Sequence, residues 1–373
     1  MKVLALSAYA AGSHSQWLAG LQAMFADWHW QVLSLPPRHF SWRVRGNPLF
    51  WSIRERETLG AQYDLLVATS LVDLATLRGL VPQLARIPTV LYFHENQFEY
   101  PQHEQQHSLL EAQMVSLYGA LAADQVAFNS SYNRDTFLEG CTDLLRRLPD
   151  FAPLEAVRQI ADKCTVVPVP VQVATVESDT SYWTARESAV PPLRLAWVGR
   201  LEHDKGAEGL LALLELMDQQ GMDYELAVVG QQFRQEPAAF TQVKRDYSHR
   251  LVHFGYLESR LDYQGLLHGA DLVLSTATHE FQGLAVMEAV LCGCVPLLPS
   301  RLVYEEIYPA NYLYRSSPGD VMAEAHSALD KLREYIDLLQ VGRLSPPDLG
   351  AWSPEHLRPR YAALFDSTCR ASG

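Results

Sequence analysis

The chain has 373 residues, of which 48% are hydrophobic and 20% charged; this composition is typical of globular proteins and excludes a disordered or fibrous chain. Acidic residues outnumber basic ones by 43 to 30, giving a formal net charge of −13. That balance excludes a uniformly basic nucleic-acid coat, although a local basic patch remains compatible with it. At about 150 residues per domain, the length indicates two domains.

The five cysteines show neither an even count nor a CxxC pair, so we expect reduced thiols and a cytoplasmic protein. The apolar stretch after Met1 is too short for a signal peptide and fits a buried strand better. The most apolar later window, residues 284–299, contains Glu288 and Pro296, so we expect no membrane span.

Short apolar runs alternate with longer amphipathic stretches along the chain. The runs that we predict to be strands are 3–6, 65–68, 89–92, 125–128, 164–167, 193–198, 225–229, 251–254, 272–274 and 295–297. The stretches that we predict to be helices are 14–25, 102–121, 130–138, 206–219, 237–247, 260–268, 284–291 and 353–369. Short strands that are apolar on both faces and separated by helices indicate buried parallel sheets, and hence an α/β fold.

A polar segment flanked by prolines lies between Pro168 and Pro192 and is typical of an interdomain linker. We predict a Rossmann-like domain over 1–172, a linker over 173–192 and a second Rossmann-like domain over 193–352. The C-terminal helix, 353–373, either stands apart or returns to the N-terminal domain. In such sheets, ligands bind at the carboxyl ends of the strands.

The first motif that carries chemistry follows the predicted strand 193–198. Gly199 is expected to let the chain turn sharply, and Arg200 and Lys205 place two cations at the carboxyl edge of the sheet. Such a pair suits a diphosphate, because arginine can donate to two oxygens while lysine acts as a point charge. The alternative is a polar loop in which either cation pairs with Asp204.

The second motif places Glu280 in a loop and Glu288 inside the following helix, with Gly283 and Leu284 at the helix start. Backbone N–H groups at that start can bind phosphate, and each carboxylate can accept hydrogen bonds from a sugar diol. In the alternative, Glu280 caps the helix and Glu288 faces solvent. The apolar neighbours of Glu288 argue against that alternative, because a buried carboxylate needs a ligand or a cation.

Together, the two motifs resemble those of glycosyltransferase family 4, which consists of retaining, nucleotide-sugar-dependent enzymes of GT-B architecture. The resemblance implies two Rossmann-like domains whose parallel sheets face each other across a cleft. It also implies that Arg200 and Lys205 hold the donor diphosphate, that Glu288 binds the ribose and that Glu280 contacts the transferred sugar. The residues at further donor positions are Gly12, Gly199, Gly230, Tyr256, Gly283 and Leu284.

The N-terminal half resembles the tRNA-queuosine α-mannosyltransferase family through three segments: Ser13-His14 with Trp17, the stretch 35–46, and the stretch 94–101 with Asn129. The resemblance spans the chain and implies transfer of mannose from GDP-mannose to the cyclopentenediol of queuosine in tRNA(Asp). His94 is then a catalytic residue beside Arg200, Lys205 and Glu280. Without the family, His94 could equally be a histidine held by Glu95 or Asn129.

The segment from residue 36 to residue 56 contains five arginines but only one acidic residue, and aromatic residues lie between the arginines. Arginines with aromatics are typical of surfaces that hold phosphates and stack on unpaired bases, so this loop is expected to bind the tRNA anticodon loop. The predicted acceptor-binding residues are His14, Arg38, Trp42, Arg43, Arg45 and Asn96. In the alternative, the segment is an arginine-rich surface loop whose aromatics pack into the core.

We therefore expect a cytoplasmic, monomeric, retaining glycosyltransferase that uses a nucleotide sugar. No Asp-x-Asp motif stands at a metal position, so we expect no metal cofactor; cations and a helix dipole would stabilise the departing diphosphate. One rival is a family 4 enzyme with a lipid or polysaccharide acceptor, although the predicted helix 14–25 lacks the basic residues of a membrane-docking helix. The other rival is a non-catalytic tRNA-binding protein with a vestigial sugar pocket.

Overall fold

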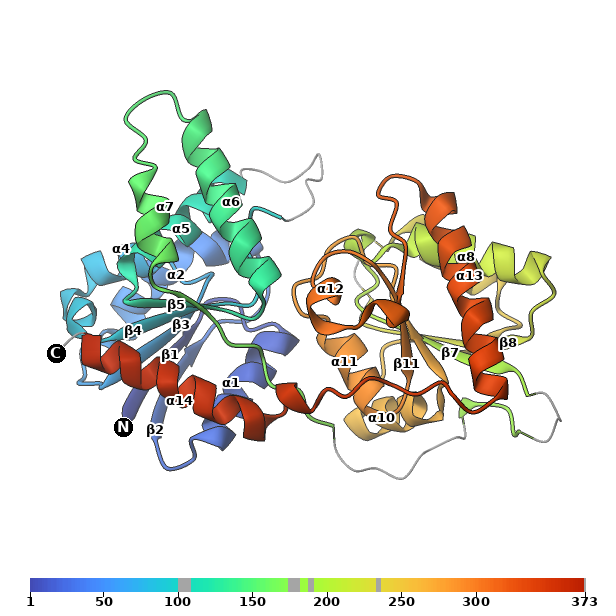
Figure 1. Cartoon of the computed structure of the whole chain (residues 1–373). Coiled ribbons are helices and arrows are strands. Elements are labelled where there is room, and N and C mark those ends of the chain that lie inside the picture. Colours follow the sequence, from blue (N-terminus) through green and yellow to red (C-terminus); the bar gives the residue numbers. More distant parts are fainter. Residues whose placement is uncertain (100–108, 174–181, 187–190, 233–235, 372–373) are drawn as a thin grey trace. The chain divides into compact units, whose positions relative to one another are not determined.

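The computed structural model describes residues 1–99, 109–173, 182–186, 191–232 and 236–371 (Figure 1). The chain divides into two compact units: unit 1 comprises Met1–Pro170 and Trp352–Gly373, and unit 2 comprises Val171–Ala351. The end of the chain therefore belongs to the same unit as its beginning. Parts of the expected linker, at 174–181 and 187–190, lie outside the described residues, as does the start of the helix expected at 102–121.

Unit 1 contains a parallel six-stranded sheet in the order β2-β1-β3-β4-β5-β6. Its strands are β1 (Lys2–Ser7), β2 (His29–Ser34), β3 (Leu65–Thr69), β4 (Thr89–Phe93), β5 (Gln125–Phe128) and β6 (Cys164–Val166). Its helices are α1 (Gly12–Met24), α2 (Phe40–Arg54), α3 (Arg56–Leu59), α4 (Leu74–Leu80), η1 (Pro82–Arg86), α5 (Leu109–Ala122), α6 (Ser131–Arg147), α7 (Glu155–Ala161) and α14 (Pro354–Ala371).

The two faces of this sheet are covered by different helices. Side chains from α2, α4 and α5 pack with alternate residues of β1, β3 and β4 into one large apolar cluster. On the opposite face, Trp17 of α1 stacks on Tyr92 of β4, and Tyr361 of α14 lies against the same tyrosine. Both faces are therefore buried, which accounts for strands that are apolar throughout.

Unit 2 contains a second parallel sheet in the order β12-β11-β10-β7-β8-β9. Its strands are β7 (Leu193–Val198), β8 (Tyr224–Val229), β9 (Leu251–Gly255), β10 (Leu272–Leu274), β11 (Val295–Pro299) and β12 (Leu313–Tyr314). Its helices are η3 (His203–Lys205), α8 (Ala207–Gln219), α9 (Ala238–Asp246), α10 (Arg260–Gly269), α11 (Leu284–Leu291), α12 (Tyr304–Ile307), η4 (Ala310–Tyr312), α13 (Val321–Gln340) and η5 (Gly350–Trp352).

The expected α/β fold with two Rossmann-like sheets is confirmed, and every strand expected from the sequence is present. Two edge strands, β2 and β12, were not expected. β2 pairs only with β1 and buries little of its surface, so its residues lack the continuous apolar run of an interior strand. The 20-residue helix α13 was also missed, although its buried residues recur at helical spacing from Ala325 to Tyr335.

The arginine-rich segment 36–56 was wrongly expected to be a loop, because most of it forms helix α2. Pro48 lies inside α2 and has no N–H to donate to the carbonyl oxygen of Val44, four residues earlier. The buried side chain of Asn47 fills that role: its Nδ2 donates to the oxygens of Val44 and Arg43, each at 2.8 Å. This side-chain hydrogen bond takes the place of the missing backbone hydrogen bond and lets the helix continue past Pro48. The local sequence pattern does not reveal this contact.

A close approach of two loops fixes the edge of the unit 2 sheet. Gly206, which ends the loop after β7, has a φ of +69°, and a Cβ atom there would lie 1.9 Å from the carbonyl oxygen of Thr276. Only glycine allows this combination of conformation and contact. The loops after β7 and β10 are thereby held together.

Substitution of Gly206 by alanine tests this close approach, with Gly221 as the matched control. Gly221 has a similar φ of +64° but open space where its Cβ would lie. We expect Gly221→Ala to lower the free energy of unfolding by about 1 kcal/mol, the cost of left-handed alanine. Gly206→Ala should cost at least about 3 kcal/mol, because backbone must also move. Urea denaturation measures both, and equal losses would contradict the packing described.

Candidate active site

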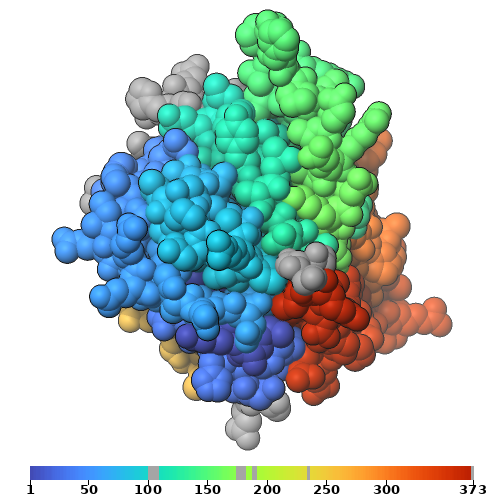
Figure 2. All heavy atoms as spheres, turned by 90° about the vertical axis from the view of Figure 1, so that its left-hand side faces the viewer, coloured from blue at the N-terminus to red at the C-terminus, as the bar shows by residue number. Residues whose placement is uncertain are grey.

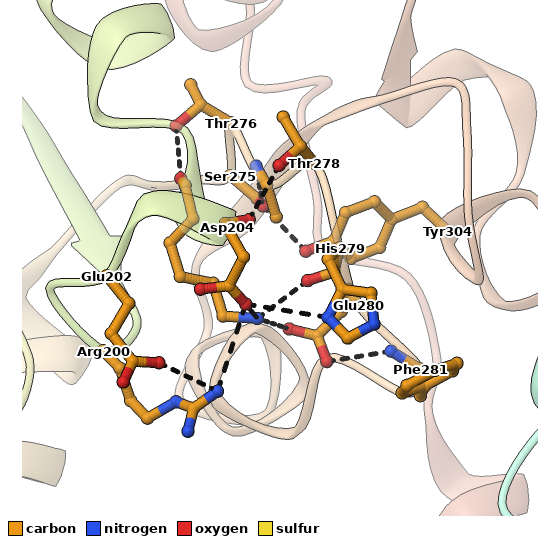
Figure 3. Close-up of polar contacts among 12 residues, drawn as sticks. Arg200, Glu202, Asp204, Ser275, Thr276, Thr278, His279, Glu280, Phe281 and Tyr304 are labelled. Atoms are coloured by element: carbon orange, nitrogen blue, oxygen red, sulfur yellow. Dashed lines mark hydrogen bonds and ion pairs between the residues drawn. The ribbon is translucent and has the colours of Figure 1, made fainter. Parts of the chain in front are cut away.

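The carboxyl edge of the unit 2 sheet brings the two charged motifs together. β7 pairs with β8 on one side and with β10 on the other, so the direction of chain progression reverses between β7 and β10. Open α/β sheets bind ligands beside such a reversal, at the carboxyl ends of the strands. The loop after β7 carries Arg200 and Lys205, and the loop after β10 carries Glu280 (Figure 3).

Lys205 lies between two carboxylates. Its Nζ is 3.2 Å from an oxygen of Asp204 and 3.2 Å from an oxygen of Glu280, and it donates to the carbonyl oxygen of His279 at 2.8 Å. Burial lowers the pKa of Lys205, but Glu280 and Asp204 outweigh burial and hold that pKa above its usual value. Lys205 is therefore a fixed positive charge at the sheet edge.

The ion pair with Lys205 also keeps Glu280 in its carboxylate form. Burial raises its pKa, but Lys205 and a hydrogen bond from the N–H of Gly283 outweigh burial, so the pKa of Glu280 is lowered. Gly283 has a φ of +71° and is the N-cap of α11, whose first residue is Leu284. Glu280 thus also caps the helix, as the alternative interpretation held, and the N–H of Gly283 that was expected to bind phosphate is already engaged.

Asp204 joins the two loops through both backbone and side chain. Its carbonyl oxygen accepts from the N–H groups of Thr278 at 2.9 Å and His279 at 3.2 Å. Its carboxylate lies near Lys205 and His279, and although burial raises its pKa, hydrogen bonds from His279 and Lys205 hold that pKa well below its usual value. Sequence reasoning treated Asp204 only as a salt-bridge partner, although its place beside Lys205 in the motif was a visible signal.

Arg200 occupies a more open position. Its Nη2 lies 3.1 Å from Glu202 and 4.0 Å from Asp204, and 43% of its side chain is exposed. Figure 3 shows Arg200 and Glu202 pointing toward each other, to one side of Asp204. The structure therefore brings Arg200, Lys205 and Glu280 to one edge, as the motifs predicted.

Glu288, on α11, is 7% exposed and pairs with Arg260 at 2.8 Å. The sequence argument held that this carboxylate needs a ligand or a cation, and the structure provides the cation. Arg260 is the first residue of α10, and its Nη2 also donates to the carbonyl oxygen of Gln172 at 3.3 Å. Nothing in the local pattern around Arg260 marked it as the partner of Glu288, which lies 28 residues later.

Two further glycines that the resemblance assigned to the donor, Gly199 and Gly230, lie at the same edge. A Cβ atom at Gly230, after β8, would lie 1.6 Å from the carbonyl oxygen of Gly199, so this position requires glycine. Gly199 was expected to permit a sharp turn, but the structure gives no reason why this position needs glycine. Its φ lies outside the left-handed region, and a Cβ atom there would make ordinary contacts. Tyr256, after β9, is 62% exposed.

At the carboxyl edge of the unit 1 sheet, His94 follows β4 inside an aromatic cluster. Its ring stacks on His14 of α1 at 4.2 Å between centroids and meets Trp17 edge-on at 4.8 Å. Its Nε2 is buried and has no hydrogen-bond partner among the described residues. Burial, reinforced by His14, holds the pKa of His94 well below its usual value, so the ring is neutral near pH 7.

Helix α14 supports this cluster from the far end of the chain. The Tyr361 hydroxyl accepts from Trp17 Nε1 at 2.9 Å and donates to the carbonyl oxygen of Pro168 at 3.0 Å. Trp17 in turn stacks on Tyr92 at 4.3 Å, and both rings contact His94. Sequence reasoning did not identify Tyr361, because the contact spans 344 residues.

Asn96, which was predicted to bind the acceptor, is engaged within the protein. Its side chain is fully buried, and its Nδ2 donates to the backbone and side-chain oxygens of Asn133 and to Thr136. Its Oδ1 accepts from the N–H groups of Phe98 and Glu99. Asn96 therefore shapes the loop after β4. Asn129 likewise holds that loop by donating to the carbonyl oxygen of His94, not to its ring.

The other predicted acceptor residues lie on or before α2, except for His14. Arg38 is exposed ahead of the helix, Trp42 is 56% exposed, and Arg43 is half-buried. Arg45 pairs with Asp73, the N-cap of α4, at 2.5 Å, while half of its side chain stays exposed. The aromatics of this segment divide: Trp51 packs into the core, whereas Trp42 and Phe50 face solvent.

Gly12, the first residue of α1, is exposed, and a Cβ atom there would meet nothing within 4 Å. Across the described ranges, no three residues of the types that usually ligate metals are grouped to hold an ion. None of the helices in those ranges is both long enough and apolar enough to span a membrane.

Two units with Rossmann-like parallel sheets, together with the sequence matches that follow, identify the chain as a glycosyltransferase of the GT-B type. The HepE protein of Anabaena, solved in complex with UDP-glucose, has the same fold, with a TM-score of 0.67 and 16% identity over 98% of this chain and 100% of that one. A family model described as glycosyl transferases group 1 matches residues 186–312.

The chain belongs to the tRNA-queuosine alpha-mannosyltransferase family. The model of that family's N-terminal region matches residues 2–171. The tRNA-queuosine alpha-mannosyltransferase of Drosophila melanogaster is 34% identical, over 98% of this chain and 96% of the relative. A GDP-mannose-dependent phosphatidylinositol dimannoside mannosyltransferase of Mycobacterium tuberculosis is 28% identical over 43% of this chain and 42% of the relative.

The neutral state of His94 predicts how stability depends on pH. With a lowered native pKa, the native ring stays neutral while the unfolded chain takes up a proton below about pH 6.5. The unfolded state then binds more protons, so stability falls as pH falls. We expect His94→Gln to flatten the drop in thermal midpoint between about pH 7 and pH 5, the range in which histidines titrate. His29→Gln, at an exposed position of unit 1, is the control, and equal slopes in His94→Gln and wild type would contradict the prediction.

Proposed function

We propose that this glycosyltransferase moves mannose from GDP-mannose to the cyclopentenediol of queuosine in tRNA(Asp), with retention of configuration. The observation that carries the proposal is the identity of 34% along nearly the whole chain with a relative of that name. The Mycobacterium relative, whose name specifies GDP-mannose, supports the choice of donor over part of the chain. The charged residues at the carboxyl edge of unit 2 supply chemistry that suits such a donor.

In the proposed donor site, Arg200 and Lys205 bind the diphosphate together with the N-terminus of α11. Lys205 is buried and already balanced by Asp204 and Glu280, so it offers a charge fixed in place before the donor arrives. Arg200 is more exposed and exchanges Glu202 for a phosphate oxygen when the donor binds. The positive end of the α11 dipole adds to the stabilisation of the leaving diphosphate.

The two glutamates have separate roles in this proposal. Glu280, held by Lys205 and the N–H of Gly283, accepts hydrogen bonds from the mannose hydroxyls. Glu288, paired with Arg260, accepts from the ribose hydroxyls. Against the effect of burial, Lys205 lowers the pKa of Glu280, and an ionised carboxylate can accept hydrogen bonds at both of its oxygens.

Retention follows from attack on the same face that the diphosphate leaves. The acceptor hydroxyl approaches the anomeric carbon while a donor phosphate oxygen takes its proton. The protein contributes position and charge stabilisation, which together lower the barrier without a covalent intermediate. Neutral His94, with a buried Nε2 that has no partner among the described residues, offers a hydrogen bond to a sugar hydroxyl.

A direct transfer assay tests the proposal. Purified protein is incubated with queuosine-containing tRNA(Asp) and either GDP-mannose or UDP-glucose, and the nucleosides are analysed by mass spectrometry. We expect a hexose on queuosine with GDP-mannose only, released by an α-mannosidase and not by a β-mannosidase. A parallel reaction with a chelator tests whether a metal is needed, and tRNA lacking queuosine is the acceptor control. Transfer to lipid or polysaccharide instead of tRNA would overturn the proposal.

The two glutamates give a second, sharper test. Glu288→Gln should weaken the binding of GDP and of GDP-mannose equally, since ribose is common to both ligands. Glu280→Gln should leave GDP binding nearly unchanged but lower kcat, since its partner is the hexose. Calorimetry and steady-state kinetics measure both effects, with Glu215→Gln on the exposed face of α8 as control. The reverse pattern would exchange the two roles.

Loss of one charge-assisted hydrogen bond to a ligand costs about 1.5–3 kcal/mol, or roughly 10- to 150-fold in affinity. Arg200→Ala is the cleaner test of the diphosphate site, because Arg200 is partly exposed. Lys205→Ala would leave Asp204 and Glu280 buried without their cation and so destabilise the fold. Unchanged GDP affinity in Arg200→Ala would remove Arg200 from the site.

A further inference from the structure

Trp42 lies flat against a glycine of its own helix. A Cβ atom placed on Gly46 would lie 2.6 to 2.8 Å from three carbon atoms of the Trp42 indole, closer than any side chain allows. The indole nevertheless stays 56% exposed. One face of the ring therefore rests on the bare backbone of α2, while the ring also presents a large surface to solvent.

This arrangement costs helix stability. Gly46 lies inside α2, where glycine is less favourable than alanine, and its φ lies outside the left-handed region, so its conformation does not require glycine. The feature that glycine does permit is the seating of the Trp42 ring. An aromatic ring held in place on a helix surface loses little entropy when a second flat ring stacks on it.

The residues around this ring are of the types that bind nucleic acid: apolar side chains that can contact bases and arginines that can bind phosphates. Leu49, Phe50 and Ile53 are also exposed on α2, so the ring belongs to an apolar surface. Five arginines precede, interrupt or follow these residues in the sequence, and all but Arg43 are exposed: Arg38, Arg43, Arg45, Arg54 and Arg56. Figure 2 shows blue atoms of the N-terminal part of the chain over the face of unit 1 that is turned toward the viewer.

The α2 surface also lies beside the loops at the carboxyl edge of the unit 1 sheet. Phe40, its first residue, meets Tyr9 of the loop after β1 at 5.7 Å between ring centroids. Arg45 pairs with Asp73 of the loop after β3. His14 and His94 lie at the same edge, so a nucleic acid that reaches them passes the start of α2.

We propose that Trp42, seated on Gly46, is a stacking platform for an unpaired base of the acceptor RNA, next to the nucleotide that receives the sugar. This inference rests on the proposed function and adds the site of a neighbouring base, with Gly46 as a positioning residue. A second copy of the chain is a poorer occupant, because a symmetric contact through α2 would bring the flanking arginines of both copies together.

Gly46→Ala is the central test, because it separates stacking from folding. The added methyl group displaces the indole, which is exposed and can swing outward, while alanine itself favours the helix. Gly20→Ala on α1 is the matched control, since a Cβ atom there meets nothing within 4 Å. Affinity for queuosine-containing tRNA(Asp) is measured by filter binding, GDP-mannose KM by kinetics and stability by thermal unfolding.

We expect Gly46→Ala to weaken tRNA binding at least about 5-fold without lowering the thermal midpoint, since alanine favours the helix, and with unchanged GDP-mannose KM. Trp42→Ala should weaken it by about 5- to 150-fold, the range measured for loss of one stacked base, and Trp42→Phe should restore most of it. The double variant Gly46→Ala with Trp42→Ala should bind no worse than Trp42→Ala alone, because the glycine acts through the ring. Gly20→Ala should bind tRNA as wild type does.

Other outcomes separate the two proposals. If wild-type protein glycosylates and binds tRNA but Gly46→Ala and Trp42→Ala bind it normally, the platform is wrong and the function stands. If wild-type protein neither binds nor modifies tRNA, the function itself fails. A shift from dimer to monomer in Trp42→Ala, seen by sedimentation, would assign the α2 surface to self-association and overturn the platform.

Discussion

The ion pair network around Lys205 is the interaction on which the carboxyl edge of the unit 2 sheet depends. A lysine buried beside the sheet would be unstable alone, but Asp204 and Glu280 hold it charged at 3.2 Å each. Because these two acids come from the loops after β7 and β10, the network also fixes the two loops to each other. Gly206 completes the junction by letting its backbone approach Thr276 more closely than a side chain would permit. The same contacts that stabilise the loops therefore hold a charged lysine at the carboxyl edge of the sheet.

In unit 1, the corresponding contacts keep a histidine neutral and oriented. His94 lies among His14, Trp17 and Tyr92, and burial lowers its pKa. The orientation of Trp17 depends on a hydroxyl from Tyr361, at the far end of the chain. The C-terminal helix thus completes the aromatic cluster of the N-terminal sheet, and Asn96 and Asn129 hold the loop in which His94 lies. The charged network and the neutral histidine therefore lie in separate units, each with its own supporting contacts.

The interior strands and the charged motifs were predictable from the sequence because they depend on local patterns. Continuous apolar runs such as β4 identify strands that are buried on both faces, and a cation after such a run must lie at the sheet edge. Edge strand β2 was missed because it lacks that pattern. Helix α2 was missed because Pro48 and Gly46 oppose a helix locally, and the compensating contacts of Asn47 and Trp42 appear only once the chain is folded.

The sequence by itself determined the α/β class, the positions of Arg200, Lys205, Glu280 and Glu288, and the concentration of arginines before and within α2, because residue type and spacing suffice for these inferences. Tertiary structure alone decided which partner each charged group takes. Arg260 reaches Glu288, Asp73 reaches Arg45, and Asn96 donates to Asn133. These choices depend on distances between residues far apart in the chain. Burial then fixes their strength, because electrostatic interactions and unmet hydrogen bonds both weigh more in a low dielectric.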